Sequence, residues 1–211
     1  MKEFTEKKHS NNQKKEFQSN LSADEIIVKA LQYHMEGNIT EATQYYKYCI
    51  AKGIDDPRIF SNYGAILQNL GELEEAANCF FRAIKLNSNF AIAHSNLGNV
   101  LRDLGKLEKA ELYIQKAIKL NPHFADAHSN LGNVLRDLGK LKDAEIAYRK
   151  AIKLDPYFAN AYSNLGNVLR DLEKPEEAKL CSDKIMSLRS WSITGSYSFN
   201  YEMKLDESHN Q

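Results

Sequence analysis

The chain has 211 residues, of which 43% are hydrophobic, so it can fold around a substantial core. Its 28 Lys and Arg residues balance its 28 Asp and Glu residues. The resulting formal net charge of zero argues against a strongly basic nucleic-acid binder and against an acidic tail protein.

The N-terminal segment, residues 1–22, is polar and charged, and we expect it to be disordered. It lacks the apolar stretch that a secretory signal needs. No part of the chain approaches the run of about 18 apolar residues that spans a membrane, so we expect no membrane partner. The three cysteines, Cys49, Cys79 and Cys181, fit no disulfide framework and no metal motif. A reducing, cytoplasmic location is the simplest interpretation.

A ten-residue sequence, SNLGNVLRDL, occurs three times, at residues 95–104, 129–138 and 163–172. The copies are 34 residues apart, and a looser copy, SNYGAILQNL, precedes them by the same interval. A fixed period of this length is the signature of a repeat architecture. The frame extends to a five-repeat array over residues 23–192, without gaps, as 23–56, 57–90, 91–124, 125–158 and 159–192. Positions within each repeat are numbered from 1 to 34.

Each repeat contains two apolar patterns with helical spacing, at positions 4, 7, 8 and 11 and at positions 20, 24, 27 and 28. Positions 8 and 20 are Gly or Ala in every repeat, which allows two helix backbones to approach closely. Position 15 is Gly in the first four repeats, which suits the left-handed residue that ends a helix. We therefore predict two amphipathic helices per repeat, which stack on their neighbours because a single pair cannot bury its apolar face.

The ends of the array differ from its middle. Ser22 and Glu25 match a capping box at the start of the first helix. In the fifth repeat Glu173 replaces the turn glycine, and Ser182 replaces the large side chain at position 24. These changes are typical of a terminal repeat that is adapted to solvent.

The 34-residue period, with this pattern of small and large positions, resembles the tetratricopeptide repeat family over residues 23–192. The SNLGNVLRDL copies are most similar to the repeats that precede the catalytic part of protein O-linked N-acetylglucosamine transferases. They also resemble bacterial repeat proteins of unassigned role. The resemblance implies an all-α fold, a right-handed superhelical solenoid of five helix-turn-helix repeats, that serves as a scaffold for protein–protein interaction.

In that family the first helix of each repeat lines a concave groove, with positions 2, 5, 6, 9, 12 and 13 facing the solvent. In this chain asparagine recurs at positions 6 and 9, and arginine at position 12. An asparagine amide donates and accepts hydrogen bonds, and the resemblance implies that the row at position 6 holds the main chain of a peptide. Arginine can pair with acidic side chains. The candidate peptide-binding residues are Asn62, Asn96, Asn99, Asn130, Asn133, Asn164, Asn167, Arg102, Arg136 and Arg170.

Structural interpretations stand beside this one. Asparagine at position 6 is common in the family and can bond across the turn between helices. Each of the three arginines precedes an aspartate at position 13, so local ion pairs on a solvated face can account for them. Serine occupies position 5, where chaperone-binding members need a cation, so binding to chaperone tails is not expected.

The repeats contain no catalytic, phosphate-binding or metal-binding motif, so we expect no enzyme activity, no metal and no cofactor. His94 and His128 share position 4 with Phe60 and Tyr162, which identifies a packing position. The cysteines are interpreted in the same way. A basic stripe on the second helices is interpreted as a solvated convex face, with an anionic partner as the alternative: Lys116, Lys119, Lys150 and Lys153.

We therefore predict a non-catalytic scaffold that binds a protein or peptide, and no nucleic acid, in its groove. The alternative is a substrate-recruiting segment of a transferase whose catalytic domain is absent from this chain. The tail at residues 193–211 contains aromatic residues without a helical period. The sequence leaves open whether this tail is flexible, folds back over the last repeat, or supports self-association through the C-terminal end.

Overall fold

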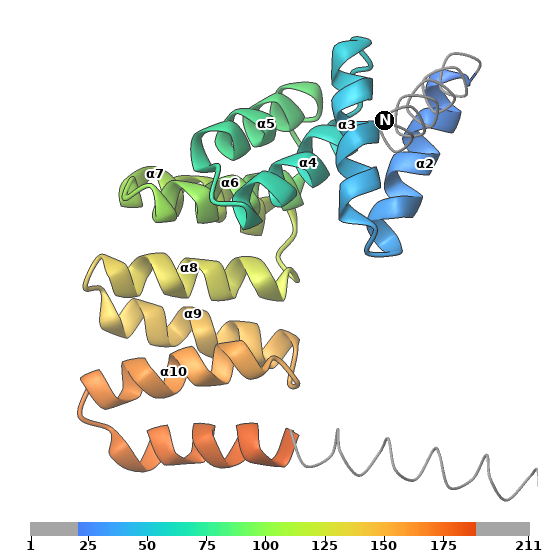
Figure 1. Cartoon of the computed structure of the whole chain (residues 1–211). Coiled ribbons are helices and arrows are strands. Elements are labelled where there is room, and N and C mark those ends of the chain that lie inside the picture. The colour runs from blue at the N-terminus through green and yellow to red at the C-terminus, as the bar shows by residue number, and fades with distance from the viewer. Residues whose placement is uncertain (1–20, 189–211) are drawn as a thin grey trace, which may run out of the picture. The chain divides into compact units, whose positions relative to one another are not determined.

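The computed structural model describes residues 21–188, and all regular secondary structure within that range is helical (Figure 1). Consecutive helices pack in pairs, so the predicted all-α fold of helix-turn-helix repeats is confirmed. The chain forms two compact units, Met1–Val100 and Leu101–Gln211. The segment expected to be disordered lies outside the described residues except for residues 21 and 22, and the tail at 193–211 lies wholly outside them.

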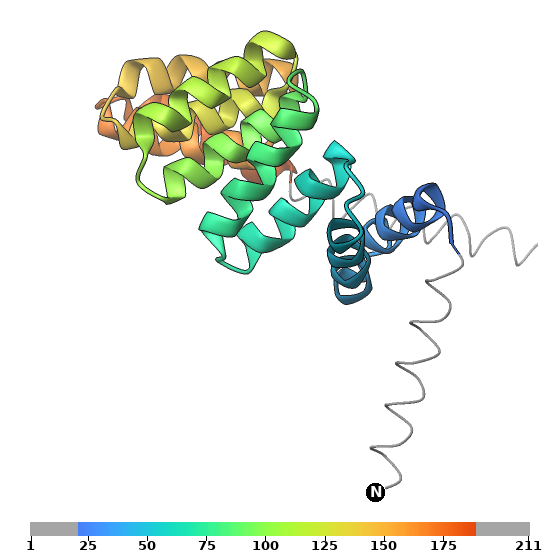
Figure 2. The ribbon, with the colours of Figure 1, turned by 90° about the horizontal axis from the view of Figure 1, so that it is seen from above.

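In the first unit α2 packs against α3 and α4 packs against α5, and both views show α2 and α3 side by side (Figures 1 and 2). The predicted capping box at the start of α2 is confirmed. The Ser22 side chain accepts a hydrogen bond from the Glu25 backbone at 3.3 Å, and the Glu25 carboxylate accepts one from the Ser22 backbone at 2.8 Å. The helices of this unit are α2 (Ala23–Met35), α3 (Ile39–Ala51), α4 (Pro57–Asn69), α5 (Leu73–Leu86) and most of α6 (Ala91–Asp103).

In the second unit each helix packs on the next in chain order, so α8 contacts α7 on one side and α9 on the other (Figure 1). A last helix, described over residues 175–188, packs its Ala178 and Cys181 into the core formed with α10. The other helices of this unit are α7 (Leu107–Leu120), α8 (Ala125–Asp137), α9 (Leu141–Leu154) and α10 (Ala159–Asp171).

In the second and fourth repeats the core contains a close approach between positions 8 and 24. Gly132 lies under the fully buried ring of Tyr148, and a Cβ atom added at Gly132 would come within 2.6 Å of the ring atom Cε1. A Cβ atom added at Gly64 would come within 3.0 Å of the Phe80 ring. In the fifth repeat Ser182 replaces the aromatic residue, and a Cβ atom at Gly166 would make only ordinary contacts, with Cys181 Cβ at 3.5 Å. A glycine covered by an aromatic ring is therefore a feature of the second and fourth repeats. The first repeat carries Ala30 with Tyr46 at these positions, and the third carries Gly98 with Ile114.

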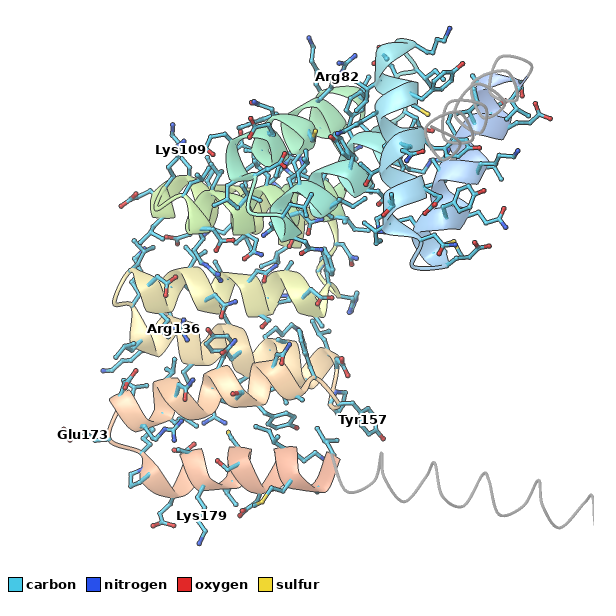
Figure 3. All side chains as sticks on the ribbon, viewed as in Figure 1. Arg82, Lys109, Arg136, Tyr157, Glu173 and Lys179 are labelled. Carbon is cyan, nitrogen blue, oxygen red and sulfur yellow. The ribbon has the colours of Figure 1, made fainter. Side chains whose placement is uncertain are left out.

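The turn between the two helices of a repeat uses a left-handed residue at position 15. Gly37, Gly71, Gly105 and Gly139 have φ between +71° and +80°. Glu173 holds the equivalent position with φ of +59°. Figure 3 shows Glu173 at the loop that joins α10 to the last helix, directed away from both helices. Its side chain therefore gains no packing there that would offset the backbone strain.

Successive repeats of the second unit are also joined by recurring ion pairs. Lys140 Nζ lies 2.8 Å from the carboxylate of Glu111, and Lys174 Nζ lies 2.8 Å from the carboxylate of Glu145. Both pairs join position 16 of one repeat to position 21 of the repeat before it. The hydrogen bond from Lys174 lowers the pKa of Glu145. The fifth repeat carries Lys179 at position 21, and Figure 3 shows it directed away from the other helices.

We expect Gly132→Ala to lower the free energy of unfolding by about 1–3 kcal/mol, because the new methyl group overlaps the Tyr148 ring in a closed core. The matched variant Gly166→Ala should instead raise it, by about 0.5–1 kcal/mol, because alanine favours the helix and the space is free. Urea denaturation followed by circular dichroism measures both. Equal effects of the two variants would contradict this account of position 8.

Glu173→Gly should raise the free energy of unfolding by about 1 kcal/mol, because glycine adopts the left-handed conformation without steric strain. The reverse change, Gly139→Glu, should lower it by a similar amount. No atom lies within 4 Å of a Cβ placed at Gly139, so that effect comes from the backbone alone. Thermal melting of the two variants checks the sign; a drop in melting temperature for Glu173→Gly would refute the assignment of strain.

Candidate functional site

The predicted asparagine at position 6 of the second repeat, Asn62, contacts a buried tyrosine of the first repeat. Asn62 Nδ2 donates to Tyr46 Oη at 3.3 Å, and His34 Nδ1 is hydrogen-bonded to the same Tyr46 Oη at 3.0 Å. The Tyr46 ring is fully buried on α3, and burial raises its pKa. The hydroxyl group thus gives Asn62 a fixed partner at the edge of the core.

A related network joins the fourth and fifth repeats. Asn133 Oδ1 accepts from Tyr148 Oη at 2.7 Å and from Asn164 Nδ2 at 3.0 Å. Within their repeats, Asn133 is at position 9, on α8, and Tyr148 is at position 24, on α9. Asn164 is at position 6 of the next repeat, on α10. Burial raises the pKa of Tyr148 to about 12, so the hydroxyl keeps its proton and donates. The two predicted asparagines are therefore brought together, each half-buried.

This arrangement fixes how the two amides point. Because both hydrogen bonds reach the oxygen of Asn133, its NH₂ group is turned away from Tyr148 and Asn164. Asn164 uses one of its two N–H groups in the hydrogen bond to Asn133, and its oxygen can accept a hydrogen bond from a ligand. Oriented amide donors and acceptors of this kind can pair with the N–H and C=O groups of a peptide.

The remaining predicted asparagines lie on the first helix of their repeats, as expected. Asn96 and Asn99 are on α6, Asn130 is on α8, and Asn167 is on α10, all half-buried. Asn167 accepts a hydrogen bond from Arg170, one turn further along the same helix. Asparagine at position 6 was also interpreted as bonding across the turn between the two helices of a repeat. Asn62 and Asn164 instead donate hydrogen bonds to residues of the preceding repeat.

The predicted arginines make local contacts. Arg102 pairs with Asp103 at 2.8 Å and with Asp137 of the next repeat at 3.6 Å. Arg136 pairs with the same Asp137 at 3.4 Å, and Figure 3 shows Arg136 on the second unit. The side chains of these residues are 23–34% exposed, so they stay accessible to a ligand. A carboxylate ligand at Arg102 or Arg136 competes with Asp137.

One expectation about the groove is wrong. Position 5 was expected to face the solvent, but Ser61 and Ser129 are buried, at 2% and 4% exposed. First helices of neighbouring repeats contact each other directly, as α8 does with α10 and α2 with α4. Ser163, in the last repeat, is exposed. Serine is small enough to let two first helices approach, which accounts for its recurrence at position 5.

Sequence reasoning missed the tyrosines at position 24 as members of the polar site. The available signal was the choice of tyrosine at a core position that Phe80 and Ile114 occupy in other repeats. A buried tyrosine hydroxyl needs a hydrogen-bond partner, so Tyr46 and Tyr148 imply a polar group nearby. In both cases that partner is one of the predicted asparagines.

The histidines at position 4 join helices to the preceding turn. His94 Nε2 donates to the Ser88 carbonyl at 3.0 Å, and His128 Nε2 donates to the Pro122 carbonyl at 3.1 Å. Both carbonyls belong to position 32 of the preceding repeat. Within residues 21–188 no group of three or more His, Cys, Asp or Glu side chains is arranged to hold a metal ion.

The cysteines are free thiols with packing roles. Cys49 and Cys181 are buried and Cys79 is half-buried. Burial raises the pKa of Cys49 and of Cys79 to about 11, and it also raises the pKa of Cys181. Thiols held in the protonated form are poor nucleophiles, which agrees with their interpretation as packing residues.

A surface pocket of about 320 Å³ occurs at equivalent places in the two units. The pocket of the first unit contains Phe60, Tyr63, Leu67 and Cys79, and that of the second unit contains Tyr162, Leu165, Leu169 and Cys181. These are the same repeat positions: 4, 7, 11 and 23. No predicted peptide-binding residue lines either pocket, so the two pockets and the asparagine network are separate features. Over the part of the chain that is described, no helix has the length and hydropathy to cross a membrane.

Sequence profiles described as tetratricopeptide repeat match residues 96–159 and 147–179, and one described as TPR repeat matches residues 69–105. Together they span residues 69–179, more than half of the chain. The chain belongs to the tetratricopeptide repeat family. No curated protein sequence matches it, and the resemblance to transferase repeats stays a prediction.

Solved tetratricopeptide repeat structures share the fold. MamA from Desulfovibrio magneticus is 24% identical, with 80% of this chain and 95% of that chain covered and a TM-score of 0.68. A thermophilic protein of Thermus thermophilus is 16% identical, with 86% and 99% covered and a TM-score of 0.68. YrrB, described as a TPR protein with an unusual peptide-binding site, is 21% identical, with 89% and 97% covered and a TM-score of 0.63. At these identities the likeness concerns the fold.

Tyr148→Phe should lower the free energy of unfolding by about 1 kcal/mol at neutral pH, because Asn133 loses its shortest hydrogen bond. The deficit should shrink as the pH rises above 10. Wild-type Tyr148 ionises in the unfolded chain near pH 10 but in the folded protein only near pH 12, so alkali destabilises wild type more than the variant. Urea denaturation at pH 7, 9 and 11 measures this difference; a constant difference would contradict the raised pKa of Tyr148 in the folded protein.

Proposed function

We propose that the protein is a non-catalytic scaffold that binds an extended segment of a partner protein along the asparagine face of its first helices. The observation that carries the proposal is the Tyr148–Asn133–Asn164 network. It presents amide groups in fixed orientations at the boundary between core and solvent. The ligand is recognised mainly through its main chain, which suits a surface made of amides rather than of pockets.

Preorganisation is the physical reason why such a network favours binding. A free surface asparagine loses side-chain rotational entropy when it binds a ligand, and each immobilised side chain costs about 0.5–1.5 kcal/mol. Asn133 and Asn164 are already held by each other and by Tyr148, so less of this cost falls on the binding step. The remaining cost is the ordering of the peptide, which keeps the expected affinity modest.

The arginines give the surface a secondary preference. Arg102 pairs with Asp103 and Asp137, and Arg136 pairs with the same Asp137, so two carboxylates of the protein balance these two guanidinium groups. The side chains are 23–34% exposed, so a peptide carboxylate can replace Asp137 as a partner, and a peptide with acidic side chains should bind better than a basic one. Support from another protein comes from YrrB, which has this fold and is described as having a peptide-binding site.

The proposal covers the whole array, as five repeats over residues 23–192 without a catalytic group or cofactor of its own. The helix pairs α2–α3, α4–α5 and α8–α9 each fall within one repeat, which supports the gapless frame. The free cysteines support the reducing, cytoplasmic location that we expect. That the array recruits substrates for a separate transferase, or self-associates through its C-terminal end, stays a hypothesis beside this proposal.

Replacing Asn96, Asn130 and Asn164 together by Ala should reduce recovery of the partner in a pull-down from source cells at least tenfold. Quantitative mass spectrometry of wild-type and variant eluates measures the change, and circular dichroism should show unchanged helicity. The control replaces two exposed asparagines outside this face, Asn78 and Asn89, and should bind like wild type. Recovery of the same proteins by the triple variant would sink the proposal.

A further inference from the structure

Three large aliphatic side chains stand exposed on the second helices of the last three repeats. Leu112, Ile146 and Leu180 are 64%, 67% and 68% exposed, and all three occupy position 22. The first two repeats carry the polar residues Gln44 and Asn78 at this position. The exposed stripe, Leu112, Ile146 and Leu180, is therefore a feature of the second unit and not a requirement of the repeat.

A pocket adjoins the stripe at its C-terminal end. This is the pocket of about 320 Å³ between α9, α10 and the last helix, and Leu180 forms part of its wall. Ile152, Tyr162 and Leu165 add apolar surface, and Lys153 supplies positive charge. Arg149 and Glu177 also line the pocket and form an ion pair with each other. Its volume is enough to accept a branched aliphatic or aromatic side chain of a partner.

The surface around the stripe is basic on one side. Lys116, Lys150 and Lys184 follow the stripe residues by four positions, which places each pair on one helix face. Lys119 and Lys153 extend the same side. In the C-terminal halves of these three helices, residues 113–120, 147–154 and 181–188, the acidic residue is Asp183 alone.

The carboxylates near these lysines form ion pairs with other residues of the protein. Glu111 is held by Lys140, Glu145 by Lys174 and Arg149, and Glu177 by Arg149 at 2.5 Å. The lysines at position 26 thus keep their charge toward the solvent. An apolar stripe with a row of cations beside it is complementary to an apolar ridge flanked by acidic residues.

We propose that the exposed stripe and its pocket bind an amphipathic helix of a partner protein that has aliphatic residues on one face and Asp or Glu beside them. An aliphatic side chain of the partner enters the pocket beside Leu180, and further ones cover Ile146 and Leu112. Acidic residues of the partner pair with Lys116, Lys150 and Lys153. This site shares no residue with the asparagine face, so the protein can hold two partners at once.

A helix fits these observations better than a lipid surface does. The pocket is a recess that receives a side chain, whereas insertion into a bilayer requires apolar side chains that protrude along a whole face. The N-terminal turns of the same helices also carry Glu108, Asp143 and Glu176. These carboxylates would lie against anionic headgroups, whereas a single helix can follow the basic side and avoid them.

The test uses a fluorescein-labelled helical peptide of 20 residues with leucines on one face and glutamates flanking them. Fluorescence anisotropy should show binding to the full chain, and a peptide with lysine in place of every glutamate should bind at least tenfold more weakly. The double variant Ile146→Glu with Leu180→Glu should also weaken binding at least tenfold. The matched control is Leu70→Glu, which changes an equally exposed leucine of the first unit and should have no effect.

Methyl NMR of the complex locates the peptide. Shifts should concentrate at Ile146, Ile152 and Leu180, and replacing Asn96, Asn130 and Asn164 by Ala should leave the affinity unchanged, which separates this site from the proposed groove. The proposal is overturned if the acidic peptide does not bind, if the lysine peptide binds equally well, or if the double variant binds like wild type. Binding of phosphatidylserine vesicles that depends on Ile146 and Leu180 would also overturn it, in favour of a membrane surface.

Discussion

The contact between an aromatic ring and a helix backbone sets how closely the two helices pack in the second and fourth repeats. Where Tyr148 lies on Gly132, the two helices approach to a distance that leaves no room for a Cβ atom. Close-packed interiors transmit such constraints, because no void is available to absorb a shift. The position of the tyrosine hydroxyl follows from where that ring lies.

The polar network depends on this packing contact. The ring of Tyr148 lies against Gly132 of α8 and its hydroxyl donates to Asn133 on the same helix, and Asn133 in turn accepts from Asn164 on α10. A core contact within one repeat therefore determines how the amides of two repeats are presented. The lesson applies at Tyr46 as well, where the hydroxyl joins Asn62 to His34. Buried tyrosines thus orient the asparagine side chains at the edge of the core.

The repeat period and the small residues at positions 8 and 20 were sufficient to predict the fold, because they are local patterns with a direct steric meaning. The Ser22–Glu25 capping box was predictable for the same reason. The burial of Ser61 and Ser129 was not predicted, because the family pattern places position 5 on the solvent-facing side of the groove. The partners of Asn133 and Asn164 were also hidden, because hydrogen bonds across repeats depend on how neighbouring helices are placed. The spacing of residues in the sequence predicts contacts within one repeat. It does not predict contacts between repeats, which depend on how the repeats are placed in space.

The ion pairs between position 16 and position 21 have a consequence for how this array can change in length. Each pair takes its lysine from one repeat and its glutamate from the one before, as in Lys140 with Glu111 and Lys174 with Glu145. A tandem duplication of 34 residues in this region therefore creates a junction whose charges already match. A repeat duplicated inside the array keeps the pairing of lysine with glutamate at both of its junctions. A repeat added after the fifth would place its lysine at position 16 beside Lys179. The near-identical SNLGNVLRDL copies have the form that such internal duplication leaves behind.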